Sequence, residues 1–246
     1  MKRLFAVTVL LAALPLHAAA PSPAITAAVA DPGRPAADSA RDAKRYPAET
    51  LEFAGIKPGQ MVGDFIMGGG YFTRIIAKTV GNKGKVYAFQ PANFIKFRPA
   101  YADEQKTVAA AYANVVPLTS DFSAVSFPKP LDVIITVQNY HDLHLGAWPA
   151  DTAAKVDSAL FKALKPGGTL VVIDHSAADG SGLRDAGTLH RIDPVTVRAE
   201  LEAAGFKYDG TSDLLRDPAD PRTKNVFDPE IRGKTDQFAL RFRKPR

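Results

Sequence analysis

The 246-residue sequence contains no cysteine. Disulfide bonds, thiolate metal sites and cysteine nucleophiles are therefore excluded. A long hydrophobic run is also missing, because the N-terminal apolar stretch, residues 4–16, is shorter than the roughly 20 residues that span a bilayer as a helix. Strong positive charge is missing too: the net charge is +5, or +3 without Lys2 and Arg3. This charge is too small and too scattered to indicate nucleic-acid binding.

The first 20 residues have the pattern of a secretory signal peptide. Lys2 and Arg3 form the positive region, residues 4–16 the apolar region, and residues 17–20 a small-residue cleavage site. We therefore predict cleavage and a periplasmic or secreted chain that has no membrane association after cleavage. Residues 21–40 are rich in Ala, Pro and Asp, which predicts a flexible lead-in without a core of its own. The folded domain is expected over residues 41–246.

Strand and helix patterns alternate through this domain, without internal repeats. We expect strands at residues 61–66, 85–89, 114–118, 131–137, 169–173, 206–212 and 238–242, with helices at 47–55, 71–80, 94–113, 151–164 and 195–204. The apolar run 131–137 is typical of a strand buried on both faces of a parallel sheet. The Pro- and Asp-rich loop 216–236 is long enough to indicate a functional loop or a lid.

A glycine run joins the first strand to the following helix. Asp64 stands near the end of the strand, and Gly68, Gly69 and Gly70 precede the helix. Glycine allows a sharp turn and a close approach of the backbone to a ligand, and the first turn of the helix offers unpaired N–H groups. A strand, a glycine turn and a helix in this order are typical of nucleotide-type cofactor sites. A plain turn between strand and helix is the alternative.

Several further motifs give the sequence a family resemblance. They are NYHD at 139–142, LKPGGTLVVID at 164–174, DHSA at 174–177, GSG at 180–182 and LHRID at 189–193. With the glycine turn and the order of elements, they resemble class I S-adenosylmethionine-dependent methyltransferases. More narrowly, they resemble a group of exported bacterial proteins classed as predicted methyltransferases. The resemblance covers residues 38–246. It implies a Rossmann-like α/β fold, a seven-stranded and mostly parallel sheet with an antiparallel last strand, S-adenosyl-L-methionine as cofactor, and methyl transfer to a small-molecule acceptor.

The resemblance also implies cofactor-binding positions, with two departures from the family pattern. Ile66 stands where the family has the first glycine, and Gln90 stands where it has an acidic residue for the ribose hydroxyls. An amide can still accept from one hydroxyl and donate to the other. Asp121 would accept from the adenine amine, or it only caps a turn. The implied cofactor-binding residues are Asp64, Gly68, Gly69, Gly70, Gln90, Asp121 and Asn139.

Histidines near the ends of the fourth and fifth strands are the catalytic candidates. The resemblance extends to small-molecule O-methyltransferases, in which a His-Asp pair after the fourth strand supplies the base, and His141 with Asp142 takes that position. A neutral imidazole suits proton removal from an acceptor hydroxyl or amine. The alternative is that His141 only orients its loop. His175, after the fifth strand, is a catalytic candidate or a hydrogen-bonded scaffold residue.

Before the first helix, Arg41 and Arg45 could cover the cofactor, but we favour a solvated helix face.

Two other functions stay open. The histidines and nearby aspartates could gather at one edge of the sheet as a nitrogen and oxygen metal site, as in a metal-dependent hydrolase. Their spacing matches no known zinc signature, so we predict no metal site. The other alternative is a degenerate methyltransferase fold that binds a metabolite without catalysis. The sequence indicates neither the acceptor nor the oligomeric state. The residues of the possible metal site are His141, His144, His175, His190, Asp142, Asp174 and Asp193.

Overall fold

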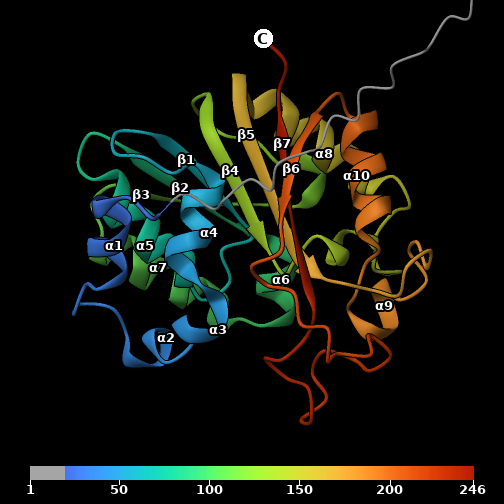
Figure 1. Ribbon diagram of the computed structural model, residues 1–246. Coiled ribbons are helices and arrows are strands. Elements are labelled where there is room, and N and C mark those ends of the chain that lie inside the picture. The colour runs from blue at the N-terminus through green and yellow to red at the C-terminus, as the bar shows by residue number, and fades with distance from the viewer. Residues whose placement is uncertain (1–19) are drawn as a thin grey trace, which may run out of the picture.

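The computed structural model describes residues 20–246, which form a seven-stranded sheet covered by helices (Figure 1). The strand order is β3-β2-β1-β4-β5-β7-β6. β7 pairs antiparallel with both β5 and β6, while the other pairs are parallel, so only the last strand runs against the rest. This confirms the Rossmann-like α/β prediction. The strands are β1 (Met61–Phe65), β2 (Lys85–Pro91), β3 (Val115–Ser120), β4 (Leu131–Val137), β5 (Leu164–His175), β6 (Lys207–Ser212) and β7 (Gln237–Arg243).

Helices cover both faces of the sheet. Those with side chains in the first core are α1 (Pro23–Val29), α4 (Pro47–Ala54), α5 (Tyr71–Val80) and α7 (Ala100–Ala111); those in the second are α8 (Thr152–Ala163) and α10 (Pro194–Ala203). Shorter helices are α2 (Ala36–Ser39), α3 (Asp42–Arg45), α6 (Ala92–Phe97), α9 (Ala186–Leu189) and the 3₁₀ helices η1 (Phe122–Ala124) and η2 (His141–His144). The helix expected at 94–113 is therefore two helices, separated by Arg98 and Pro99.

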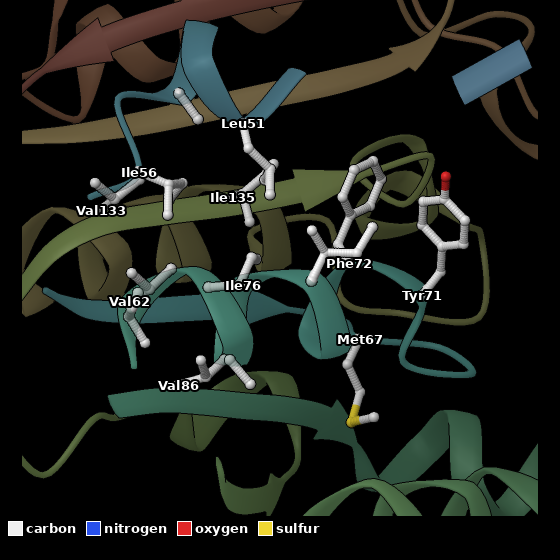
Figure 2. Packing of buried hydrophobic residues seen from close by; sticks show 14 of the residues in the cluster. Leu51, Ile56, Val62, Met67, Tyr71, Phe72, Ile76, Val86, Val133 and Ile135 are labelled. Carbon is white, nitrogen blue, oxygen red and sulfur yellow. The ribbon is translucent and has the colours of Figure 1, made fainter. Parts of the chain in front are cut away.

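The two cores follow from the alternation of side chains along the strands. On β4, Val133 and Ile135 belong to the first core, whereas Ile134 belongs to the second. Figure 2 shows Phe72 and Ile76 of α5 among the strand side chains of the first core. This packing fixes α5 against the sheet, and with it the glycine turn from which α5 begins.

Residues 21–40 are not a flexible lead-in, so that prediction is wrong. Ser22 caps α1 and Pro23 occupies its first turn, and α1 packs against α5 and α4. Ile25 is fully buried in the first core, and the guanidinium of Arg34 makes two hydrogen bonds of 2.7 Å to Asp42. The segment therefore contributes to the core, because α1 carries a small apolar face despite its polar surroundings.

The predicted signal peptide, residues 1–20, lies almost entirely outside the described residues. Within residues 20–246, no helix combines the length and the apolar character needed to cross a membrane.

The carboxyl ends of the parallel strands point to one edge of the sheet. Figure 1 shows α2, α3, α6, α9 and the long loop between β6 and β7 beyond this edge. The loop has no helix or strand, as expected, but it is anchored: Arg191, fully buried, pairs with Asp220 at 2.8 Å, and the Ser176 N–H donates to the Asp236 carbonyl at 2.9 Å. The loop thus forms a fixed wall beside the strand ends.

Candidate active site

The glycine turn is a tight backbone structure between β1 and α5. Ile66, Gly68 and Gly70 all have positive φ, of 65°, 55° and 81°. Glycine adopts this region without strain, whereas a β-branched residue such as Ile66 is strained there. The first departure from the family pattern therefore keeps the turn and adds strain.

Asp64 lies under this turn and is 4% exposed. Its carboxylate accepts a 2.5 Å hydrogen bond from the Thr73 hydroxyl of α5. Burial raises the pKa of Asp64 to about 6, although the bond from Thr73 opposes the shift. A buried carboxyl with a pKa close to neutral is available to respond to a cationic ligand.

Gln90, at the end of β2, is fully buried beside the turn. Its Oε1 accepts from the Gly68 N–H at 3.0 Å, and its Nε2 has no partner. A buried amide N–H without a partner is costly unless a ligand accepts from it. The second departure therefore supports the glycine turn with its oxygen and leaves a donor free.

A cavity of about 160 Å³ opens next to the glycine turn. Four of the predicted cofactor-binding residues line it: Asp64, Gly68, Gly69 and Asn139. Gly70 and Gln90 do not line it. Asn139 fixes the wall by donating to the carbonyls of Ile66, at 3.1 Å, and Val137, at 2.6 Å, and so joins the ends of β1 and β4.

The N-terminal segment covers the same cavity. Arg41 and Arg45 both line it, and the guanidinium of Arg45 donates to Gln138 Oε1 at 2.8 Å. Arg45 also lies over the Tyr71 ring, 4.7 Å from its centre. The favoured interpretation as a solvated helix face is wrong for Arg45, which packs on Tyr71 and Gln138, whereas the side chain of Arg41 lines the cavity and is still 48% exposed.

Asp121 lies apart from this cavity. It lines a second hollow of about 220 Å³ with Asn93, Phe122 and Trp148. Its side chain makes no capping bond to η1, although it precedes that helix. The prediction that it contacts the cofactor remains a prediction.

The catalytic candidates meet at the ends of β4 and β5. The Nδ1 atom of His141 lies 2.9 Å from Asp174, and its Nε2 lies 3.2 Å from His190 Nδ1 and 3.3 Å from Asp142. His141 is 3% exposed and Asp174 fully buried. Burial alone would lower the pKa of His141, but the Asp174 carboxylate outweighs it, and the pKa is raised. Adjacency in the sequence suggested Asp142 as the partner that orients His141, but Asp174 bonds its Nδ1.

His175 has a different environment. Its Nδ1 lies 2.8 Å from the Thr235 hydroxyl of the long loop, and burial lowers its pKa to about 4. The imidazole is therefore neutral at pH 7 and ties β5 to the loop. Its place favours the scaffold alternative, and its catalytic role stays a prediction.

The other members of the possible metal site are separated. His144 contacts Glu200 at 3.1 Å, and Asp193 caps α10 by accepting from the Val195 N–H at 2.9 Å. His190, which follows α9 with a φ of 54°, remains beside His141 and Asp142. Of the seven residues considered from the sequence, His141, Asp142 and His190 can reach one common ion.

Comparison with solved structures identifies the fold. A SAM dependent methyltransferase from Aquifex aeolicus superposes with a TM-score of 0.56 and 24% identity over 80% of this chain and 88% of that one. The chain has the class I methyltransferase fold. The same fold is found in the [4+2]-cyclase SpnF, with a TM-score of 0.59 and 17% identity over 82% of this chain and 81% of that one.

One sequence relative also carries the name of a methyltransferase. The ubiquinone/menaquinone biosynthesis C-methyltransferase UbiE of Hydrogenovibrio crunogenus is 26% identical over 126 residues. The match covers 51% of this chain and 46% of that protein. No family model matches the chain.

Proposed function

We propose that this protein is an S-adenosyl-L-methionine-dependent methyltransferase that acts on a small-molecule acceptor. The observation that carries the proposal is the cavity between the glycine turn and the end of β4, with Asp64, Gly68 and Asn139 in its wall. In open α/β sheets, ligands bind at the carboxyl ends of the strands near such a turn. The class I methyltransferase fold and the names of the relatives support this cofactor.

The residues present fit the cofactor. A Cβ built on Gly68 meets no atom within 4 Å, so this glycine leaves open space at the cavity wall. Asp64, in the cavity wall, can face a cationic group, and Gln90, which is buried outside the lining, supports the turn through its bond to the Gly68 N–H. Arg41 and Arg45 can face a carboxylate. When bound, the cofactor supplies a methyl group on a positively charged sulfur.

The acceptor would bind on the side of His141. Asn139 lines the cavity, and His141 follows it by two residues in the same loop, so the histidine cluster is adjacent to the cofactor region. His190 is partly exposed and forms the outer side of this cluster. A small hydroxyl or amine compound fits such a site better than a polymer, because the long loop between β6 and β7 bounds the site on one side.

Calorimetric titration with S-adenosyl-L-methionine and with its demethylated product tests the proposal. We expect both to bind the wild-type protein. Gly68→Ala should weaken binding by at least tenfold, because the added methyl group enters the space left at the cavity wall. Gly70 is less suitable for substitution, since a Cβ there would lie 2.6 Å from Val108.

Gly59→Ala is the matched control. Gly59 also has a positive φ, of 83°, and open space around a built Cβ, but it does not line the cavity. Both variants therefore carry a similar backbone strain. Equal affinities of the two variants, or a wild-type protein that binds neither compound, would contradict the proposal.

A fold that binds the cofactor or another metabolite without methyl transfer is the second candidate. Ile66 and Gln90 favour it, because both depart from the family pattern, and the fold also occurs in a protein named as a cyclase. Incubation with methyl-labelled cofactor and a panel of small hydroxyl and amine compounds distinguishes the two. Label transfer that is lost in Gly68→Ala supports the enzyme, and binding without transfer to any compound supports the alternative.

We further propose export, with residues 1–20 as the signal peptide, on the sequence pattern alone. Cell fractionation with N-terminal sequencing of the mature chain tests this. A chain that retains Met1 in the cytosolic fraction would contradict it.

A further inference from the structure

Three potential ligand atoms converge at the outer side of His141. They are His141 Nε2, His190 Nδ1 and one carboxylate oxygen of Asp142, separated by 3.2 Å, 3.3 Å and 3.9 Å. Zinc-ligand bonds of about 2.0–2.2 Å at tetrahedral angles place ligand atoms roughly 3.3–3.6 Å apart. The three atoms thus have the spacing of a bound ion with little need for movement.

When His141 is neutral, hydrogen bonds leave one of these three atoms unsatisfied; when it is protonated, its Nε2–H donates to Asp142, and a bound ion would take the place of that proton. His141 Nδ1 donates to the buried carboxylate of Asp174, so in the neutral ring Nε2 carries a lone pair. This lone pair faces an oxygen of Asp142 at 3.3 Å, which is also an acceptor. His190 can donate one hydrogen to Nε2, but it leaves the oxygen without a donor from this pair. A cation between the three atoms would satisfy all of them.

Asp174 supplies the support that metal-binding histidines usually have. Its carboxylate accepts from His141 Nδ1 at 2.9 Å and from the backbone N–H groups of His141 and His175, each at 2.8 Å. A carboxylate on the far nitrogen fixes the tautomer that presents Nε2 to a metal and increases its basicity. Because Asp174 is fully buried on β5, the orientation of the ring is fixed before any ion binds.

The site is also accessible and incomplete. The side chain of His190 is 26% exposed, and its ring packs against that of Phe227, whose residue is 57% exposed. Ions can therefore enter from solvent. Three protein ligands with one open side are typical of catalytic rather than structural metal sites.

We propose that His141, Asp142 and His190 bind one divalent transition-metal ion. Two imidazoles and one carboxylate suit zinc or iron(II) and disfavour magnesium, which prefers oxygen ligands. The sequence predicted no metal site because these residues belong to two separate loops and have no motif spacing. This inference goes beyond the proposed function and does not depend on the cofactor. If the ion is bound, Nε2 of His141 is a ligand and is not free to act as the base.

Calorimetric titration of the chelator-treated protein with zinc chloride tests the proposal, with magnesium chloride as a second titrant. We expect one zinc ion per chain and no measurable magnesium binding. His190→Asn should weaken zinc binding by at least 100-fold. Asparagine tolerates the left-handed backbone of this position, so the variant is expected to fold. Asp142→Asn is the second variant, since it keeps the shape of the side chain and removes its charge.

His144→Gln is the matched control, because His144 contacts Glu200 and lies outside the three-ligand set. It should bind zinc as the wild type does. Absence of zinc binding by the wild-type protein would overturn the proposal. So would unchanged zinc affinity in folded His190→Asn and Asp142→Asn, or an equal loss in His144→Gln. Zinc binding is measured without the cofactor and cofactor binding without zinc, so either proposal can fail alone.

Discussion

Asp64 is the residue through which we expect binding of the proposed cofactor to depend on pH. It is 4% exposed, and burial raises its pKa to about 6, which is higher than the usual value near 3.8. Ionised Asp64 attracts the sulfonium and ammonium groups of the proposed cofactor, whereas the protonated form does not. The charge state of one residue should therefore set the affinity in the range between pH 5 and 7.

We expect cofactor affinity to increase by about tenfold from pH 5 to pH 7 and then to level off. At pH 5 only about a tenth of Asp64 is ionised, and the apparent affinity decreases with the competent fraction. Calorimetry at several pH values measures the effect. Asp64→Asn keeps an acceptor for Thr73 and should bind weakly at every pH. An equally steep profile in this variant would assign the effect to another group.

The sequence predicted which residues gather at the glycine turn better than it predicted the surroundings of His141. Asp64, Gly68, Gly69 and Asn139 line one cavity because β1 and β4 are neighbours and both end there. The partner of His141 was not predictable from adjacency. Asp142 follows it in the chain, but the pairing of β4 with β5 brings Asp174 to its Nδ1. Such contacts depend on strand register, which a single sequence does not specify.

At the scale of elements, a buried polar network joins η2, α8 and α10. Tyr140 lies directly before η2. Its hydroxyl is within hydrogen-bond distance of two carboxyl groups, at 2.9 Å from Asp157 of α8 and 3.0 Å from Glu200 of α10. His144 of η2 contacts the same Glu200 oxygen. Burial, and the nearby charge of Glu200, raise the pKa of Asp157 to about 8. The network fixes the loop that carries His141, and it contains a carboxyl that resists ionisation.

We expect Asp157→Asn to stabilise the protein much more at pH 9 than at pH 5. In the folded state Asp157 keeps its proton up to about pH 8, whereas in the unfolded state it loses it near pH 4. The folded state binds more protons between these values, so the free energy of unfolding decreases as pH rises through this window. Asparagine removes this loss, which is on the order of a few kcal/mol. Urea denaturation at both pH values measures it.

Asp151→Asn serves as the control for that measurement. Asp151 precedes the same helix, but its side chain is 57% exposed. The pH dependence of the free energy of unfolding in Asp151→Asn should match that of the wild type. If Asp157→Asn also leaves this dependence unchanged, the acidic network does not destabilise the protein at high pH.

At the scale of the whole molecule, the N-terminal segment is a part of the domain rather than a linker to it. α1 packs on α5 and α4, and the following residues carry Arg41 and Arg45 onto the cavity. Composition misled here, because Ala, Pro and Asp are typical of linkers. A local signal was nevertheless present: Ser22 followed by Pro23 is a favourable helix start, with a capping side chain and a proline in the first turn.

Substitution in α1 tests whether the segment contributes to stability. Ile25 has no exposed surface and belongs to the first core. Ile25→Ala should lower the free energy of unfolding by about 2–5 kcal/mol, through lost burial and the cavity left behind. Thr26→Ala, one residue further on the exposed side, should change it by about 0.5 kcal/mol or less. A flexible lead-in would make both changes equally small. If Ile25→Ala is destabilising, as expected, and also weakens cofactor binding, then folding of α1 is coupled to the placement of Arg41 and Arg45 at the cavity.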